Sequence, residues 1–303
     1  YLEINLEKMM EEELYADFAI LFRLLNATRM PINADQTEES YIEFYHQESL
    51  ASGSRIREKL SEAVEKSIKA LANGFLEHPF NLTLSNEIDG GYLKPETYYN
   101  YQLRLIYRLL FLIVTEERNL VYPVMTPSQP PPHGGGEYTR MRKIYYDHYS
   151  IERLRRLAGK FYFVDGRKQD LWEGLLTTFR IFEDGAYGEK LGIKPLGSGI
   201  FSNDALGLLN ESKLSNATLL EVIKNLTFFE NSHGQLVRVN YSDLDVEEFG
   251  SVYEELLEYD ATFIHVDGRV RFEFAKGEGR SRSGAHYTPE ELVKPLIRHS
   301  LDY

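Results

Sequence analysis

Apolar residues recur every three or four positions along much of the chain, which is the spacing of an amphipathic α-helix. This pattern predicts helices over residues 1–30, 41–50, 54–76, 96–118, 171–182, 203–209, 216–228 and 245–259. The segment 96–118 differs from the others because it is apolar almost all round. We therefore expect it to be the central core helix.

Short β-structure is expected near the end of the chain. Residues 262–274 alternate between apolar and polar side chains, and Asp267-Gly268, a dipeptide that favours a two-residue hairpin turn, divides them. Residues 236–241 are compatible with a short strand. The predicted fold class is mainly α, an irregular multi-helix bundle with a small β-hairpin near the C-terminus.

A proline- and glycine-rich stretch, residues 123–137, can be neither a helix nor an inner strand. It is either a linker between subdomains or a long excursion on one domain. We favour the excursion, because the flanking helices are too apolar to stand apart. The predicted organisation is a helical subdomain over 1–122, this loop, a second helical subdomain over 138–279 that carries the hairpin 262–274, and a last segment, 280–303.

Composition narrows the class of protein. The 303 residues contain no cysteine, which excludes a disulfide scaffold and cysteine-ligated zinc and fits a reducing cytoplasm. No apolar run approaches the length of a membrane span, so no membrane partner is expected. A net charge of −13 argues against a general nucleic-acid clamp.

Positive charge is nevertheless concentrated in residues 138–168, where tyrosines and phenylalanines are interleaved with it. This is the credible DNA-backbone patch of an acidic chain. The alternative is a solvated helix face that pairs with the acidic segment Glu3 to Glu13. No nuclease or metal site is predicted, because Asp165-Gly-Arg-Lys168 lacks a strand context and a second acid. The candidates for DNA-backbone contact are Arg140, Arg142, Lys143, Arg153, Arg155 and Arg156.

A strong helix start lies in residues 280–303. Thr288 is placed as the N-cap, Pro289 at the first helical position and Glu291 at the third, which completes a capping box. Such a helix start presents free backbone N–H groups and a positive dipole end to a carboxylate or a phosphate. Isolated capping boxes are common, so the box alone indicates only a well-formed helix.

The same residues carry a resemblance. Ser283-Gly-Ala-His-Tyr-Thr-Pro-Glu-Glu-Leu-Val293 resembles the segment that opens the methyltransferase domain of large adenine-N6 DNA methyltransferases, including fused type IIG-like restriction–modification enzymes. In that family the segment packs against the methionine end of S-adenosylmethionine. The resemblance implies that Tyr287, Thr288 and Pro289 flank the amino-acid part of this cofactor, with His286 as a further neighbour.

The resemblance extends over most of residues 60–300. It includes Arg104–Arg118, Tyr146–Leu154, Arg238–Leu244 and Glu248–Glu258, in the order of the family. His286 departs from the more usual tyrosine. The family's Asp-Pro-Ala-Cys-Gly-Ser-Gly loop and its Asn-Pro-Pro-Tyr/Phe catalytic tetrapeptide do not occur.

The resemblance implies that the chain is the helical region that precedes a methyltransferase domain. Because it begins with Tyr1 and stops before the family's next element, we expect a piece of a longer protein. The implied activity of that protein is S-adenosylmethionine-dependent methylation of adenine N6 in double-stranded DNA, in a restriction–modification or phage-defence system. Its own nuclease, methyltransferase and target-recognition domains are the implied partners, and no catalytic residue is expected here. The alternative is a helical spacer or interaction module that contacts neither cofactor nor DNA.

Overall fold

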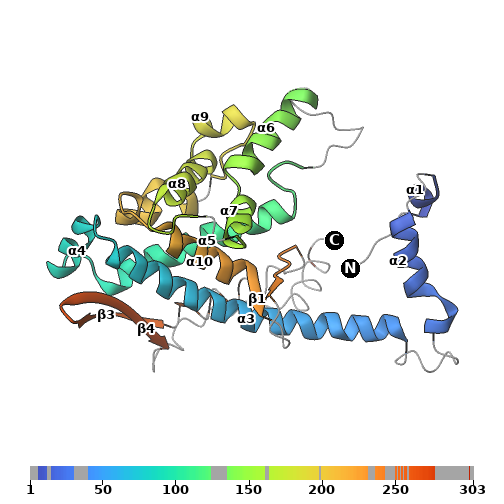
Figure 1. Cartoon of the computed structure of the whole chain (residues 1–303), viewed down its shortest axis with the longest axis horizontal. Coiled ribbons are helices and arrows are strands. Elements are labelled where there is room, and N and C mark those ends of the chain that lie inside the picture. The colour runs from blue at the N-terminus through green and yellow to red at the C-terminus, as the bar shows by residue number, and fades with distance from the viewer. Residues whose placement is uncertain are drawn as a thin grey trace. The chain divides into compact units, whose positions relative to one another are not determined.

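Helices make up most of the residues that the computed structural model describes (Figure 1). The description covers residues 6–11, 15–30, 40–123, 135–160, 164–197, 199–230, 236–242 and 259–276, with isolated positions between 250 and 257 and at 300. Two small antiparallel strand pairs complete it. The predicted fold class, mainly α with a small β-hairpin near the C-terminus, is confirmed. Among the described residues, no helix has the length and apolar character needed to cross a bilayer.

The chain divides into two compact units, residues 1–58 and 59–303. The first contains α1 (Leu6–Glu11), α2 (Tyr15–Leu25) and the 3₁₀ helix η1 (Ala27–Arg29), where the sequence predicted one helix. It also contains the beginning of α3 (Tyr41–Glu77), which replaces two predicted helices with one. Gly53 does not interrupt α3, because glycine costs about 1 kcal/mol relative to alanine but keeps its backbone N–H.

The core of the second unit is built around α5 (Pro95–Glu117). Pro95 occupies the first turn, where its missing N–H costs nothing. Leu105, Ile106 and Leu109 are completely buried, and so are Val64 and Ile68 of α3. Each such side chain contributes roughly 1.5–3 kcal/mol when it leaves water. The prediction that 96–118 forms the central core helix is confirmed.

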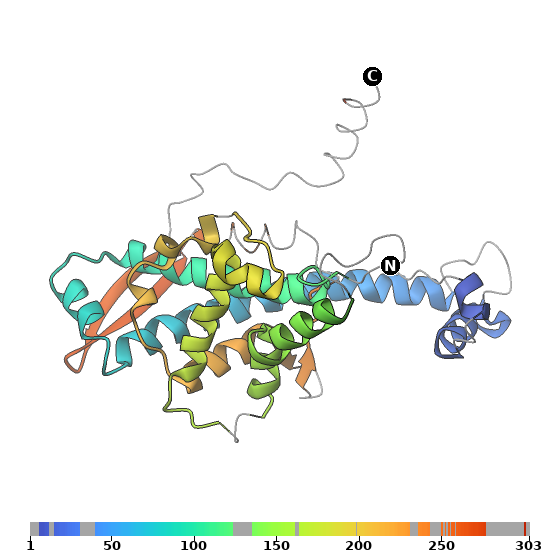
Figure 2. The ribbon, with the colours of Figure 1, turned by 90° about the horizontal axis from the view of Figure 1, so that it is seen from above.

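The second unit contains several further helices. They are α4 (Leu82–Asp89), α6 (Gly135–His148), α7 (Ile151–Ala158), α8 (Asp170–Glu183), α9 (Gly185–Gly188), η4 (Glu189–Leu191), η5 (Gly199–Phe201), η6 (Asn203–Asn210) and α10 (Asn216–Thr227). Ser150 caps α7 by accepting a hydrogen bond from the Arg153 N–H, and Ser215 caps α10 in the same way. In the second unit, α7 packs against both α5 and α10 (Figures 1 and 2).

Residues 203–209 form 3₁₀ structure instead of the predicted α-helix. Gly207 interrupts the helix with a φ of 49°. A Cβ atom at this position would lie 2.2 Å from the Tyr101 ring, so the close approach of the backbone to α5 requires glycine.

The β-hairpin forms as predicted. Strands β3 (Tyr259–Val266) and β4 (Arg269–Lys276) pair in register with Val266 opposite Arg269. Asp267 and Gly268 both have positive φ, as a two-residue hairpin turn of type I′ requires. The hairpin packs its inner face on the helices, where the buried Phe272 ring lies 5.5 Å from the Tyr98 ring.

A second strand pair joins β1 (Phe228–Glu230) to β2 (Leu236–Arg238). The sequence predicted β2, but it placed residue 228 in a helix and predicted no partner strand. Of the helix predicted over 245–259, the described positions 250, 252, 254, 256 and 257 are helical. Its expected capping residues, Asp245 and Glu248, lie outside the described residues.

The predicted subdomains do not match the two observed units. The sequence divided the chain around the loop 123–137, whereas the units divide between residues 58 and 59. Because α5 packs on α7 and both belong to the second unit, the segment between them joins helices of one unit. The expectation that residues 123–137 contain no helix is corrected at its end, because residues 135–137 form the first turn of α6. Residues 124–134, like 280–303 apart from 300, lie outside the described residues.

Candidate functional site

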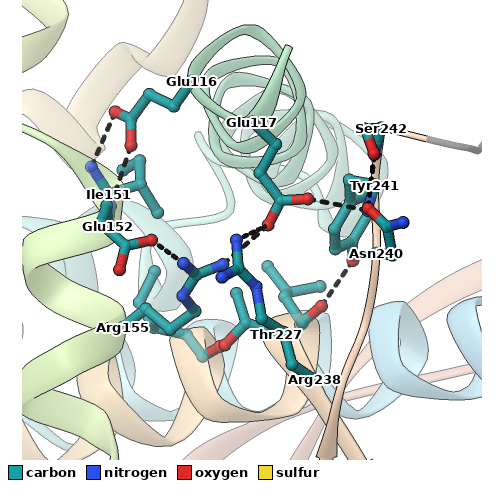
Figure 3. Close-up of polar contacts among 12 residues, drawn as sticks. Glu116, Glu117, Ile151, Glu152, Arg155, Thr227, Arg238, Asn240, Tyr241 and Ser242 are labelled. Atoms are coloured by element: carbon teal, nitrogen blue, oxygen red, sulfur yellow. Dashed lines mark hydrogen bonds and ion pairs between the residues drawn. The ribbon is translucent and has the colours of Figure 1, made fainter. Parts of the chain in front are cut away.

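A cavity of roughly 190 Å³ lies where the C-terminal end of α5 meets four other elements. Tyr146 of α6, Thr227 of α10 and Arg238 of β2 contribute to its wall. The charged groups at this point are shown in Figure 3. The cavity is lined by Ile113, Glu116, Glu117, Tyr146, Ile151, Glu152, Arg155, Thr227 and Arg238.

Glu116 caps α7 from a different helix. Its carboxylate accepts hydrogen bonds from the Ile151 N–H at 2.8 Å and the Glu152 N–H at 2.9 Å. The Tyr145 hydroxyl donates a third, at 2.8 Å. The two backbone donors belong to the first turn of α7, whose N–H groups have no partner within the helix. The positive end of the helix dipole favours an anion at this position.

The pKa of Glu116 is set by opposing influences. Burial is the largest and raises the pKa of this carboxyl to about 8. The hydrogen bonds from Ile151 and Tyr145 and the charge of Arg155 act in the opposite direction, whereas the neighbouring Glu117 adds to the increase. Glu116 is thus a buried acid that titrates near neutral pH.

Glu117, the next residue, joins three parts of the unit. It accepts hydrogen bonds from Arg155 Nη1 at 2.7 Å and from Arg238 Nη2 at 2.8 Å. The Tyr241 N–H donates to its other oxygen at 2.8 Å. One carboxylate therefore ties the end of α5 to α7, to β2 and to the turn that follows β2 (Figure 3).

The charges in this cluster are engaged with one another. Arg155 also pairs with Glu152 on its own helix. Thr227 donates its hydroxyl to the Ile223 carbonyl. Among the described residues, the Tyr146 hydroxyl is a buried group of this wall that has no hydrogen-bond partner. The arrangement is well suited to fixing helices against one another, since breaking a buried ion pair costs about 3–5 kcal/mol.

A second buried cation lies further back on α5. Arg108 donates from Nε to the Ile200 carbonyl and from Nη2 to the Ser202 carbonyl, both at 2.7 Å. Its guanidinium also lies 4.9 Å from the centre of the Phe179 ring. Burial lowers its pKa to about 10, so it remains charged at neutral pH. Arg108 therefore fastens η5 to the core helix.

The predicted site residues have different outcomes. The cofactor candidates His286, Tyr287, Thr288 and Pro289 lie outside the described residues. The predicted role of Arg155 in DNA contact is corrected: its side chain is 7% exposed and pairs with Glu117, so it is not available to a phosphate. Of the other DNA candidates, Arg153 is half-buried, and the exposed ones are Arg140, Arg142, Lys143 and Arg156.

The Glu116–Glu117 cluster was not among the site residues predicted from the sequence. Glu117 pairs with Arg155 of a neighbouring helix, whereas Glu116 binds backbone N–H groups and Arg108 binds carbonyls. The available signal was the position of two adjacent acids at the end of an apolar helix. A carboxylate that close to a core must find donors.

Metal ligation finds no support in the described part of the chain, where no group of three or more His, Cys, Asp or Glu side chains could hold an ion. Asp165, considered above for a nuclease-like motif, pairs with Arg167 instead. Comparisons with known proteins found no matching family model, no similar curated protein and no similar solved structure.

Proposed function

We propose that this chain is the helical connector ahead of the catalytic domain of an S-adenosylmethionine-dependent DNA adenine-N6 methyltransferase. The parent protein would serve a restriction–modification or phage-defence system. The proposal rests on the resemblance of segment 283–293 and of the helical segments that precede it.

One structural observation supports a connector role. Three segments that carry the resemblance, 104–118, 146–154 and 238–244, meet at Glu116 and Glu117. Glu116 binds the N–H groups of Ile151 and Glu152 in the second segment, and Glu117 binds the third. These motifs are far apart along the chain but interlock in space. A connector that holds its helices in fixed positions would need these contacts between the three segments.

In the parent protein, the cofactor site is proposed to begin after the hairpin. Thr288 would direct the free N–H groups of its helix start at the cofactor carboxylate, and Glu291 would hold the cap. Tyr287 and Pro289 would form the pocket wall, beside His286. The target adenine would be flipped out of the duplex, as for other enzymes that act on a base.

Cofactor binding tests this proposal. We expect the full-length native gene product to bind S-adenosylmethionine in calorimetry, and Thr288→Ala to weaken binding about fivefold through the loss of a cap worth roughly 1 kcal/mol. Thr177→Ala is the matched control, because Thr177 is exposed on α8 and its hydroxyl bonds within that helix. Equal affinities for both variants would refute the assignment of Thr288.

A second candidate is a helical spacer that contacts neither cofactor nor DNA. The observation that favours it is the internal pairing of Arg155, Arg238 and Glu117 around the cavity. This candidate predicts that the full-length protein methylates DNA equally well when the exposed cations of α6 and α7 are neutralised. A connector that contacts DNA predicts instead that the same substitutions lower the rate of DNA methylation.

A further inference from the structure

Exposed cations cover the outer side of α6 and α7. Arg140, Lys143 and Asp147 succeed one another on α6 at three- and four-residue spacing, so they share one face of this helix. Arg142 occupies the neighbouring row, and Arg156 is exposed on α7. We refer to Arg140, Arg142, Lys143 and Arg156 as the α6–α7 basic surface.

Contacts at Tyr146 and Asp147 connect three of these cations, Arg142, Lys143 and Arg156. The Arg142 guanidinium lies 5.4 Å from the centre of the Tyr146 ring, and Arg156 Nη2 donates to the Tyr146 carbonyl at 3.5 Å. Lys143 Nζ binds Asp147 at 2.5 Å. This hydrogen bond, with the nearby charges of His148 and Arg156, lowers the pKa of Asp147. Lys143 and Arg156 therefore lie near one carboxylate, Asp147, while Arg142 and Arg156 both contact Tyr146.

The local charge is opposite to that of the chain as a whole. Residues 135–160 contain seven arginines and lysines against three acids, whereas the 303 residues carry a net charge of −13. An anionic polymer is therefore attracted to this part of the chain and repelled by the remainder. Binding will be local, and its strength will depend strongly on salt.

Arginine geometry favours phosphate as the bound group. The Arg142 guanidinium lies over the Tyr146 ring, and among the described residues no hydrogen bond occupies its donors. Such a planar fork matches phosphate oxygens in a bidentate manner. We propose that the α6–α7 basic surface binds the phosphate backbone of duplex DNA. This inference rests on the proposed function for DNA as the partner, and it adds the surface through which the connector touches that substrate.

The test measures DNA binding without methylation. Anisotropy of a fluorescent duplex is titrated with the 303-residue chain over a range of salt concentrations. The patch variant is Arg142→Gln, Lys143→Gln, Arg156→Gln. The control variant, Lys190→Gln, Lys194→Gln, Lys224→Gln, removes the same charge from exposed lysines outside α6 and α7. A third variant, Arg142→Lys with Arg156→Lys, keeps the charge, and circular dichroism verifies that each variant is folded.

We expect the patch variant to bind at least tenfold more weakly than the control variant. The slope of log affinity against log salt should fall by about 2–3, because each phosphate contact contributes roughly 0.9. The charge-keeping variant should retain the salt slope of the wild type. Equal affinities of the patch and control variants would overturn the proposal. So would binding of a poly-glutamate peptide in preference to DNA, which would make the surface a protein-docking site. Both results are binding measurements that need no methyl transfer. The DNA-binding surface can therefore fail this test while the proposed methyltransferase function stands, and the reverse.

Discussion

Arg155 Nη1 donates a hydrogen bond of 2.7 Å to Glu117 Oε1, and each side chain is 7% exposed. The pair joins the last turn of the core helix α5 to α7. Since Glu117 also binds Arg238 and the Tyr241 N–H, the loss of its carboxylate removes an acceptor shared by two cations and one backbone donor, and it leaves Arg155 with only its Glu152 pair.

We expect Glu117→Ala to lower the free energy of unfolding by about 3–5 kcal/mol, the cost of breaking a buried pair. Denaturant unfolding measures this loss. Glu173→Ala is the matched control, because the Glu173–Lys213 pair is 51% and 38% exposed and such pairs contribute under about 1 kcal/mol. A double-mutant cycle with Arg155→Ala should show strong coupling. Additive losses would contradict the role assigned to this pair.

Stability should fall with rising pH because of Glu116. The native pKa is raised to about 8 from an ordinary value of 4.5, so the native state holds a proton that the unfolded chain releases in this range. The contribution is complete below pH 4.5 and is lost as the pH rises through 8. Its slope reaches at most about 1.4 kcal/mol per pH unit. The groups that face this carboxyl are Tyr145, Tyr146, Glu117 and Arg155.

Glu116→Gln isolates this titration. We expect the stability difference between wild type and variant, measured by urea unfolding, to shrink as the pH rises from about 5 to 8. The variant should be less stable at pH 5, because its amide places N–H groups against the N–H donors of α7. Glu173→Gln, an exposed carboxyl, should leave the pH slope of the wild type unchanged. If the unfolding free energy of Glu116→Gln kept the pH slope of the wild type, groups other than Glu116 would be responsible for that slope.

Asn73 fixes the β3–β4 hairpin to α3. Its side chain donates to the Phe272 carbonyl at 3.1 Å and accepts from the Phe272 N–H at 3.0 Å. The Asn73 amide thus makes the two backbone hydrogen bonds that a neighbouring strand would otherwise make. Asn73→Ala should cost about 1–3 kcal/mol, because two backbone groups beside a buried ring lose their partner. Hydrogen exchange of the Phe272 amide measures the local loss. Asn100→Ala, at an exposed position of α5, should leave that exchange rate unchanged.

Two glycine-to-alanine substitutions should have opposite effects. Gly207→Ala should lower the melting temperature, since the new Cβ would lie 2.2 Å from the Tyr101 ring at a φ of 49°. Gly174→Ala in α8 meets no atom within 4 Å and should stabilise the helix by about 0.5–1 kcal/mol. Thermal unfolding of both variants provides the comparison. A stabilised Gly207→Ala would contradict the close packing of η6 on α5.

Local patterns predicted the parts of the fold that local forces determine. The all-round apolar pattern of 96–118 identified the core helix, and Asp267-Gly268 located the hairpin turn to the residue. The break at Gly207 was not predictable, because it depends on Tyr101, a ring from another helix. The continuity of α3 through Gly53 was missed for a similar reason, since a weak helix former does not by itself end a helix.

Candidate site residues were harder to predict than elements. The sequence grouped Arg155 with Arg153 and Arg156 as equivalent cations, but only the helix orientation shows that Arg155 faces the core. Arg155 belongs to the buried row of α7 with Ile151, Leu154 and Ala158. The apolar character of these neighbours could have signalled this. The pairing partners Glu117 and Arg238 are 121 residues apart and could not have been matched from spacing alone.

The central claim is tested most directly by methyl transfer from S-adenosylmethionine to duplex DNA by the full-length native gene product. Mass spectrometry of the digested DNA identifies the product. We predict N6-methyladenine, and we predict its loss when residues 280–303 are deleted. A full-length protein that binds the cofactor but leaves adenine unmethylated would contradict the account, as would methylation that survives the deletion.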